Sequence, residues 1–236
     1  MEQRGQAAFF DLDRTLIAVN SAALWIRYEY AQGRISRGQL AEAVFWFAGY
    51  RVGLVEVEVG IRRAAASMRG RVEAEVDAAV QAWFDDAISP TFLVEGREAV
   101  EAHRAQGHAV VLLTSSSPYI SGLVQKELNL DDVLCTRFEV KDGVFTGRIV
   151  PPVCYGEGKV AAASAWALEA GVDLSRSYFY TDSHSDLPML DAVGHPRVVN
   201  PDPRLARVAR KRGWRVLRWA RTGPIVPRAG ESSGGL

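Results

Sequence analysis

Features typical of secreted, membrane-spanning and nucleic-acid-binding proteins are scarce in this sequence. Its 236 residues include only two cysteines, Cys135 and Cys154, whose spacing suits neither a disulfide framework nor a metal site. Lys and Arg together number 28 and so do Asp and Glu, so the chain has no net charge that would attract nucleic acid. The apolar run at residues 7–10 is too short for a signal peptide or a membrane span. We therefore expect a soluble, cytoplasmic protein without a nucleic-acid or membrane partner, and the sequence leaves its oligomeric state open.

A dinucleotide fingerprint and internal repeats are also missing. No G-x-G-x-x-G follows the first apolar run, which disfavours a dinucleotide-binding fold. The stretch 204–218 is rich in arginine, and we interpret it as a solvated helix face running into a final strand rather than a surface for anionic substrates. The segment 223–236 is rich in Pro, Gly and Ser, a composition typical of a disordered tail.

Short apolar runs alternate with helical patterns over much of the chain. The runs predict buried strands at 7–10, 109–113 and 178–180, and a hairpin over 138–150 around an Asp-Gly turn. The helical patterns lie at 97–106, after Ser117 and Pro118, and at 158–170. Strands that alternate with helices indicate an α/β fold, a doubly wound parallel sheet with helices on both faces.

The interval 19–88 has helical spacing instead. Leu24, Trp25 and Tyr28 share one helical face, and Ser36 is a candidate N-cap for a second helix. A four-residue repeat of apolar side chains covers 72–84, and we predict helix for 55–59 as well, although Val and Glu alternate there. The interval also carries aromatic side chains that would either line a pocket or form the core of the interval itself, and we favour the core. These residues are Trp25, Tyr28, Phe45, Trp46 and Phe47.

Polar residues follow three of the predicted strands. In parallel α/β sheets the ligand crevice lies beyond the carboxyl ends of the strands, so these residues should converge. Two carboxylates two residues apart on a strand point to the same side, repel each other and call for a cation such as Mg²⁺. Alone, such a pair is more often part of a turn or a helix N-cap. The three clusters are Asp11-Leu12-Asp13, Thr114-Ser115-Ser116 and Thr181-Asp182-Ser183.

These clusters carry a resemblance to the haloacid dehalogenase superfamily of hydrolases. The string FFDLDRTLI is similar to its first motif, D-x-D-x-T after an apolar strand, and includes Thr15 as a supporting residue. VVLLT, which ends at Thr114, GEGK, which ends at Lys159, and TDSHSDLPML, with Asp182 and Asp186, resemble the second, third and fourth motifs. Each motif is weak alone, but their order and their places at strand ends make a strong signal together.

The resemblance implies a phosphatase mechanism with named roles. Asp11 would attack phosphorus to form an aspartyl-phosphate, and Asp13 would protonate the leaving group and later deprotonate water. The Thr114 hydroxyl and the Ser115 N–H would bind a phosphate oxygen, and Lys159 would neutralise charge on the phosphoryl group.

The same resemblance implies one Mg²⁺ ion. Its ligands would be Asp11, Asp182 and the backbone carbonyl of Asp13. Asp186 would contact a metal-bound water or hold Lys159, although an acid before a helix is also a good N-terminal charge partner. We interpret His184 as an exposed loop residue.

Within the superfamily the chain is similar to the phosphoserine-phosphatase branch. That likeness implies a core at 1–18 and 89–222, a helical cap at 19–88, and a contact from Asn200 to the site. Phosphoserine phosphatases bind the substrate ammonium through a Glu nine positions after the nucleophile, and this chain has Asn20 there. Phosphoserine itself is therefore in doubt, and other small monophosphates, including histidinol phosphate, remain open.

Three rival functions fit the sequence less well. A dehalogenase has no use for Asp13, because no alkoxide leaves. A phosphomutase or other phosphotransferase of the same superfamily is compatible with the motifs, but a large helical cap favours hydrolysis. A non-enzymatic phospho-acceptor module similar to response-regulator receivers would be about half this length and would carry its acceptor Asp on a later strand.

Overall fold

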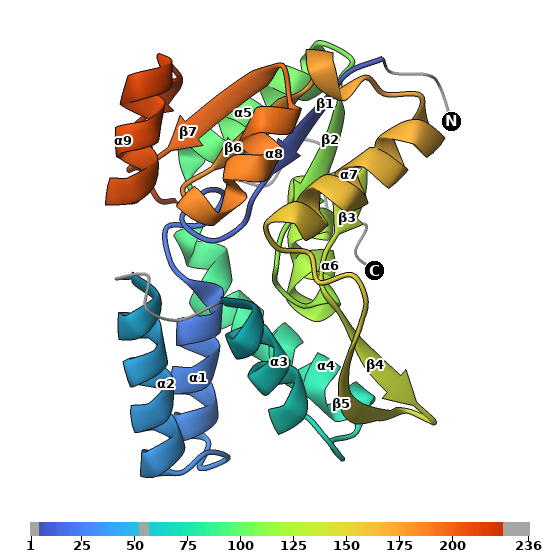
Figure 1. The fold of residues 1–236 in the computed structure, drawn as a ribbon. Helices are drawn as coiled ribbons and strands as arrows, with labels where there is room; N and C mark the ends of the chain where they lie inside the picture. The colour runs from blue at the N-terminus through green and yellow to red at the C-terminus, as the bar shows by residue number, and fades with distance from the viewer. Residues whose placement is uncertain (1–4, 52–56, 224–236) are drawn as a thin grey trace, which may run out of the picture.

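A six-stranded parallel sheet forms the centre of the molecule (Figure 1). The computed structural model describes residues 5–51 and 57–223. The strand order is β3-β2-β1-β6-β7-β8, and every neighbouring pair in this sheet is parallel. The predicted doubly wound parallel sheet is confirmed. The strands are β1 Ala7–Phe10, β2 Ala109–Leu113, β3 Asp132–Leu134, β6 Tyr178–Thr181, β7 His195–Val199 and β8 Arg215–Leu217.

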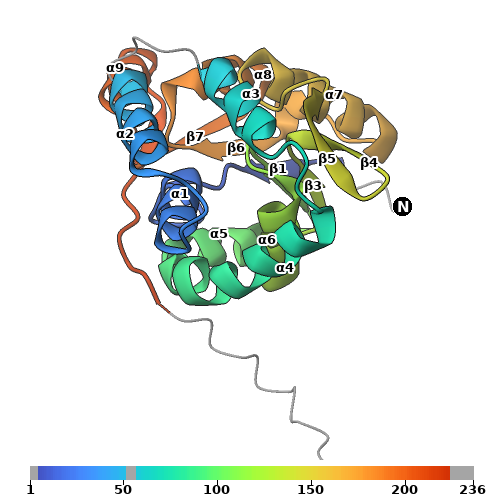
Figure 2. The same cartoon turned by 90° about the horizontal axis from the view of Figure 1, so that it is seen from below.

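Helices cover both faces of this sheet, as Figure 2 shows. Successive strand residues point to opposite faces, so the fully buried Phe9 and Phe10 belong to different apolar clusters. The cluster of Phe10 includes side chains of α5 (Val94–Ala105) and α6 (Pro118–Leu128). The cluster of Phe9 includes side chains of three further helices: α7 (Glu157–Ala170), α8 (Leu187–Ala192) and α9 (Pro203–Arg212).

Helices also fill most of the interval between β1 and α5. Ser36 caps the second of them, because its hydroxyl accepts from the Gln39 N–H at 3.3 Å while the Gln39 side chain accepts from the Ser36 N–H at 2.8 Å. The predicted helix at 55–59 is confirmed only from Val57, because 52–56 lie outside the described residues. The elements are α1 Ser21–Ala31, α2 Arg37–Arg51, α3 Val57–Ser67, α4 Glu73–Trp83, the π-helix η1 Phe84–Ile88 and the 3₁₀ turn η2 Ser89–Thr91.

The aromatic residues of this interval do not act as one group. Trp25 packs edge-on against Trp83 and contacts Tyr28, and both Trp25 and Tyr28 lie against the apolar cluster of the sheet. Trp46 packs onto Gly60, where an added Cβ would come within 2.0 Å of the indole ring. The expectation of a core position is wrong for Phe45, which is 78% exposed, and the side chain of Phe47 lies outside the described residues.

The predicted hairpin forms, but outside the main sheet. Strands β4 (Arg137–Lys141) and β5 (Val144–Val150) pair around Asp142 and Gly143, which both have positive φ as such a tight turn requires. The hairpin attaches to the α3–α4 connection, because Phe145 exchanges backbone hydrogen bonds with 70–71 at 2.9 and 3.0 Å. It therefore adds to the layer of α3 and α4, on the lower right of Figure 1.

A membrane-spanning helix must be long and apolar. Among the helices of residues 5–51 and 57–223, none has the length and apolar character that a bilayer crossing requires.

Candidate functional site

The three polar clusters lie at the carboxyl ends of adjacent strands. Strand β1 lies between β2 and β6, with Phe10 in register with Leu112 on one side and Tyr180 on the other. The Asp11 N–H donates to the Tyr180 carbonyl at 2.9 Å, which fixes the chain just beyond the strand. The residues that follow β1, β2 and β6 therefore meet at one edge of the sheet, facing the layer of α1–α4 (Figure 1).

Lys159 joins the first and fourth motifs. It lies in the first turn of α7, is 2% exposed, and donates from Nζ to Asp11 Oδ1 at 2.9 Å and to Asp186 Oδ2 at 2.8 Å. Asp186 Oδ2 also accepts from the Thr181 hydroxyl at 2.7 Å. Of the two roles predicted for Asp186, the contact with Lys159 is the one present in this geometry.

The cluster holds more negative charge than one lysine balances. Burial raises the pKa of Asp11 to about 7, while Lys159 acts to lower it and Asp186 acts to raise it. Burial and the charge on Asp11 raise the pKa of Asp182 well above its usual range. Burial alone would lower the pKa of Lys159, but Asp11 and Asp186 reverse that effect and raise it. Several buried acids that resist ionisation are the electrostatic signature of a place that needs another cation.

The oxygen donors at this edge fit Mg²⁺. The predicted ligands are the carboxylates of Asp11 and Asp182 and the backbone carbonyl of Asp13, and Mg²⁺ prefers one or two carboxylates completed by waters and a phosphate oxygen. Among the described residues, no group of three or more His, Cys, Asp or Glu side chains is arranged to hold a metal. The predicted ligand set contains only two carboxylate side chains and therefore stays a prediction.

Asp13 is held by the beginning of α1. Its Oδ1 accepts from the Ser21 N–H at 3.0 Å, and its Oδ2 accepts from the Asn20 side-chain amide at 2.9 Å. Burial raises the pKa of Asp13, and the bonds from Ser21 oppose that rise. The contact between Asn20 and Asp13 was not predicted from the sequence. The available signal was an Asn directly before a helical pattern, a typical N-cap.

The residues predicted to support phosphate binding differ in their surroundings. Thr114 is 2% exposed and its hydroxyl accepts from the Ser116 N–H at 3.2 Å, while Ser115 is half-buried. The buried Thr15 hydroxyl has no hydrogen-bond partner within the part of the chain that the structure describes. His184 is half-buried rather than exposed, and its N–H donates to Asp202 Oδ2 at 2.7 Å.

Asn200 is used differently from the prediction. Its side-chain NH₂ donates to the Trp219 carbonyl at 2.7 Å, and its side-chain oxygen accepts from the Trp219 N–H at 3.1 Å. Both polar groups of the amide are therefore engaged in fixing the chain beyond β8. The printed sequence offered no sign of this, because the two residues are nineteen positions apart.

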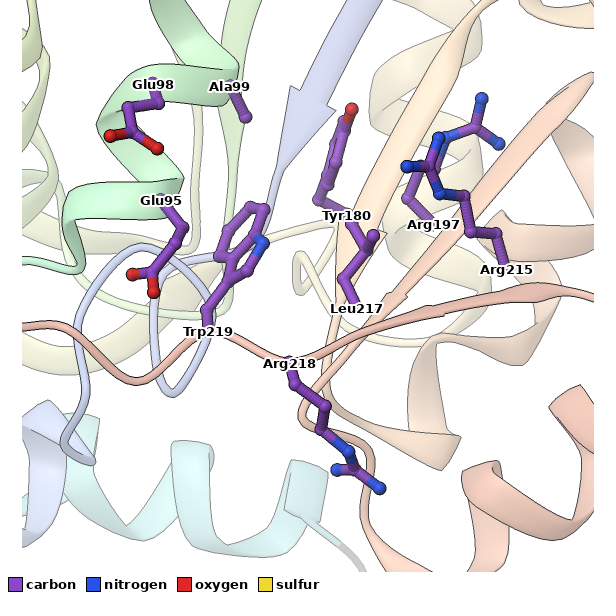
Figure 3. A pocket seen from close by; sticks show the side chains of 9 residues that line it. All are labelled: Glu95, Glu98, Ala99, Tyr180, Arg197, Arg215, Leu217, Arg218 and Trp219. Atoms are coloured by element: carbon purple, nitrogen blue, oxygen red, sulfur yellow. The ribbon is translucent and has the colours of Figure 1, made fainter.

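A separate hollow of about 360 Å³ lies on the sheet face beside α5 (Figure 3). Tyr180, Arg197 and Arg215 stand next to one another across β6, β7 and β8. On the opposite wall, Glu95 and Glu98 both pair with Arg221, which is not among the lining residues. The hollow contains none of the predicted catalytic residues. Its lining is Glu95, Glu98, Ala99, Tyr180, Arg197, Arg215, Leu217, Arg218 and Trp219.

Known proteins similar to this chain include named phosphatases. A phosphoserine phosphatase of Mycobacterium tuberculosis is 34% identical over 215 residues, which cover 89% of this chain and 70% of that protein. A histidinol-phosphatase of Neisseria meningitidis is 28% identical over 215 residues, which cover 89% of this chain and 97% of that protein.

A solved structure and a family model extend the comparison. The structure of a protein of unknown function from Bordetella pertussis superposes with a TM-score of 0.81 at 30% identity, covering 90% of this chain and 97% of that one. Residues 8–191, from β1 to α8, match the model of the haloacid dehalogenase-like hydrolases. That range contains all four motifs, and the chain belongs to the haloacid dehalogenase-like hydrolase family.

Proposed function

We propose that this protein is a Mg²⁺-dependent phosphatase that hydrolyses a small phosphomonoester through an aspartyl-phosphate on Asp11. The observation that carries the proposal is the buried contact of Lys159 with Asp11 at 2.9 Å, beside Asp182 and at the ends of three parallel strands. A carboxylate next to a fixed positive charge can approach an anionic ester, since the charge on the phosphoryl oxygens is partly neutralised. The named relatives support the reaction class, because both are phosphatases by name.

The chain's own residues would share the first chemical step. Asp11 forms a bond to phosphorus as the bond from phosphorus to the ester oxygen breaks, and the departing oxygen takes a proton from Asp13. Lys159 donates to the phosphoryl group, together with the Thr114 hydroxyl and the Ser115 N–H. A bound Mg²⁺ would add positive charge beside the same oxygens, held by Asp11, Asp182 and the Asp13 carbonyl.

The second step restores the protein. Water attacks phosphorus of the aspartyl-phosphate, gives its proton to Asp13, and releases inorganic phosphate and the Asp11 carboxylate. Asp13 must therefore exist in both protonation states during one turnover. Its partly buried position, which raises the pKa of the carboxyl group, favours the protonated form needed for the first step.

The substrate class follows from the neutral side chain at position 20. Asn20 offers no negative charge, and both of its polar groups are engaged by the protein. An ammonium group on the substrate would find weak compensation there, so we propose a small monophosphate other than phosphoserine as the preferred substrate. The name of the Neisseria relative makes histidinol phosphate one candidate for the panel below.

Phosphate release from a panel of small esters tests this proposal. With Mg²⁺ present, we expect the protein to hydrolyse p-nitrophenyl phosphate. We also expect it to hydrolyse at least one alkyl phosphate faster than it hydrolyses phosphoserine. EDTA should abolish turnover and added Mg²⁺ should restore it. Asp182→Asn should lose that recovery, whereas Asp191→Asn, which alters an exposed acid paired with Arg212, should retain it. Full activity in EDTA would refute the proposed dependence on Mg²⁺. Phosphoserine as the best ester by a wide margin would refute the proposed substrate class.

A further inference from the structure

We propose that Asn20 is a positioning residue that orients the carboxyl group of Asp13 from the N-terminus of α1. The inference rests on the proposed function, in which Asp13 is the proton donor and acceptor. It assigns to this chain a link between α1, the first helix after β1, and the proton-transfer step.

Both polar groups of the Asn20 side chain have fixed partners. Its Oδ1 accepts from the Ala23 N–H at 2.9 Å, which caps α1, and its Nδ2 donates to Asp13 Oδ2 at 2.9 Å. A backbone N–H can only donate, so the end of the amide that faces Ala23 must be the carbonyl oxygen. The NH₂ end must then face Asp13, and this network settles the orientation of the amide.

A second donor from the same helix holds the other oxygen of Asp13. The Ser21 N–H donates to Asp13 Oδ1 at 3.0 Å, and Ser21 is only 4% exposed. The short loop before α1 turns back so that these groups can meet, with the Arg14 N–H donating to the Val19 carbonyl at 3.1 Å. Two donors on two different oxygens fix both the position and the plane of the carboxyl group.

This arrangement also directs the catalytic proton. The Ser21 N–H and the Asn20 amide are both donors, so neither can accept the proton of a protonated Asp13. That proton must occupy a lone pair that neither of these two donors uses. Asn20 thereby favours the orientation in which Asp13 can give its proton to a departing ester oxygen.

The dependence of rate on the leaving group tests this role. The alkoxide of β-glycerophosphate needs a proton as it leaves, whereas 2,4-dinitrophenolate leaves without one. The measured quantity is kcat/KM for each ester, because it covers phosphoryl transfer to Asp11 and not the later hydrolysis. General acid catalysis is worth ~10²–10⁴ in rate, so loss of correct orientation should remove about 10-fold or more of it.

Asn20→Asp is the informative variant, because Asp has the same shape and caps a helix as well as Asn but cannot donate to Asp13. We expect its kcat/KM for β-glycerophosphate to fall at least about 10-fold further than its kcat/KM for 2,4-dinitrophenyl phosphate. In an Asp13→Asn background the same change should leave the ratio of the two rates unaltered. Ser36→Ala, which removes the N-cap of α2, is the matched control and should also leave that ratio unaltered.

The possible outcomes separate this inference from the function on which it rests. If Asn20→Asp keeps the wild-type ratio, including the case in which both rates fall equally, Asn20 does not orient Asp13 for proton transfer and the inference is overturned. If the wild-type protein hydrolyses neither ester with Mg²⁺ present, the proposed function fails and this inference fails with it.

Discussion

His103 is a buried titratable side chain outside the cluster of Asp11, Lys159 and Asp186. Its Nδ1 lies 2.9 Å from Nδ1 of His108, and its Nε2 lies 2.9 Å from the Tyr180 hydroxyl. Burial lowers the pKa of His103 to about 4, and the nearby His108 and Arg197 act in the same direction. The ring is therefore neutral in the folded protein near pH 7, and it gains a proton more easily once the chain unfolds.

This difference predicts a loss of stability in mild acid. The unfolded chain binds a proton at His103 near pH 6.5, while the folded protein resists it until about pH 4. The neutral ring makes its full contribution to the free energy of unfolding above pH 6.5. That contribution is lost progressively as the pH falls toward 4, by about 3 kcal/mol at most. Urea unfolding of the wild type and of His103→Gln should show a shallower pH dependence for the variant over that range. Parallel curves would contradict the account, since carboxylates titrate alike in both proteins.

Single residues also mark the limit of what the sequence predicts here. The order of Asp11, Thr114, Lys159 and Asp182 along the chain indicated a common site, because each follows a strand or begins a helix. The Asn before a helical pattern indicates the cap of α1, but the bond from Asn20 to Asp13 and the bonds of Asn200 with Trp219 depend on where separate segments meet. An Asn side chain can cap a helix, bind a ligand or hold a distant backbone segment, and the residue type alone does not indicate which of these it does.

At the scale of elements, the start of α7 places Lys159. Gly158 precedes Lys159 in the first turn, and a Cβ added at Gly158 would lie 1.9 Å from the Val153 carbonyl oxygen. That oxygen belongs to the backbone, so a larger residue cannot be accommodated by rotating a side chain. The close approach of the chain at Val153 to α7 therefore requires glycine.

Gly158→Ala is expected to shift the first turn of α7 and Lys159 with it. Overpacking of this kind costs about 1–3 kcal/mol of stability. A displacement of Lys159 on the order of 1 Å should lower kcat by about 10-fold or more. The matched control is Gly122→Ala in α6, where an added Cβ meets nothing within 4 Å. This substitution should stabilise the folded protein by about 0.5–1 kcal/mol. Thermal unfolding and phosphate release measure both effects, and a Gly158→Ala protein with normal stability and turnover would refute the argument.

Elements with strong local signals were predicted well, and their placement was predicted less well. The Asp142-Gly143 turn indicated the hairpin β4–β5, and the structure has it. Its attachment to the α3–α4 connection through Phe145 was not predicted, because pairing between distant segments leaves no periodic pattern. The exposure of Phe45 on α2 was missed for a related reason, since helical spacing identifies a face but not what covers it.

At the scale of the whole molecule, the alternation of strands and helices was sufficient to predict a doubly wound parallel sheet. Parallel strands end at a common edge, so the fold also explains why motifs 148 residues apart, at Asp11 and Lys159, form one contact. The order of the strands within the sheet was not predicted, because pairing between distant segments leaves no local pattern. The hollow beside α5 depends on chain that returns from β8 across the sheet face, an arrangement without a sequence signature.

The central claim is that Asp11 forms the covalent intermediate. Rapid acid quenching during turnover, followed by borohydride reduction and peptide mass analysis, tests it most directly. The account predicts homoserine at position 11 in the wild-type protein, because reduction of an aspartyl-phosphate gives that residue, and no such product in Asp11→Asn. A reduction product at a different residue, or normal turnover by Asp11→Asn, would contradict the claim. The absence of any reduced residue would favour direct attack by water.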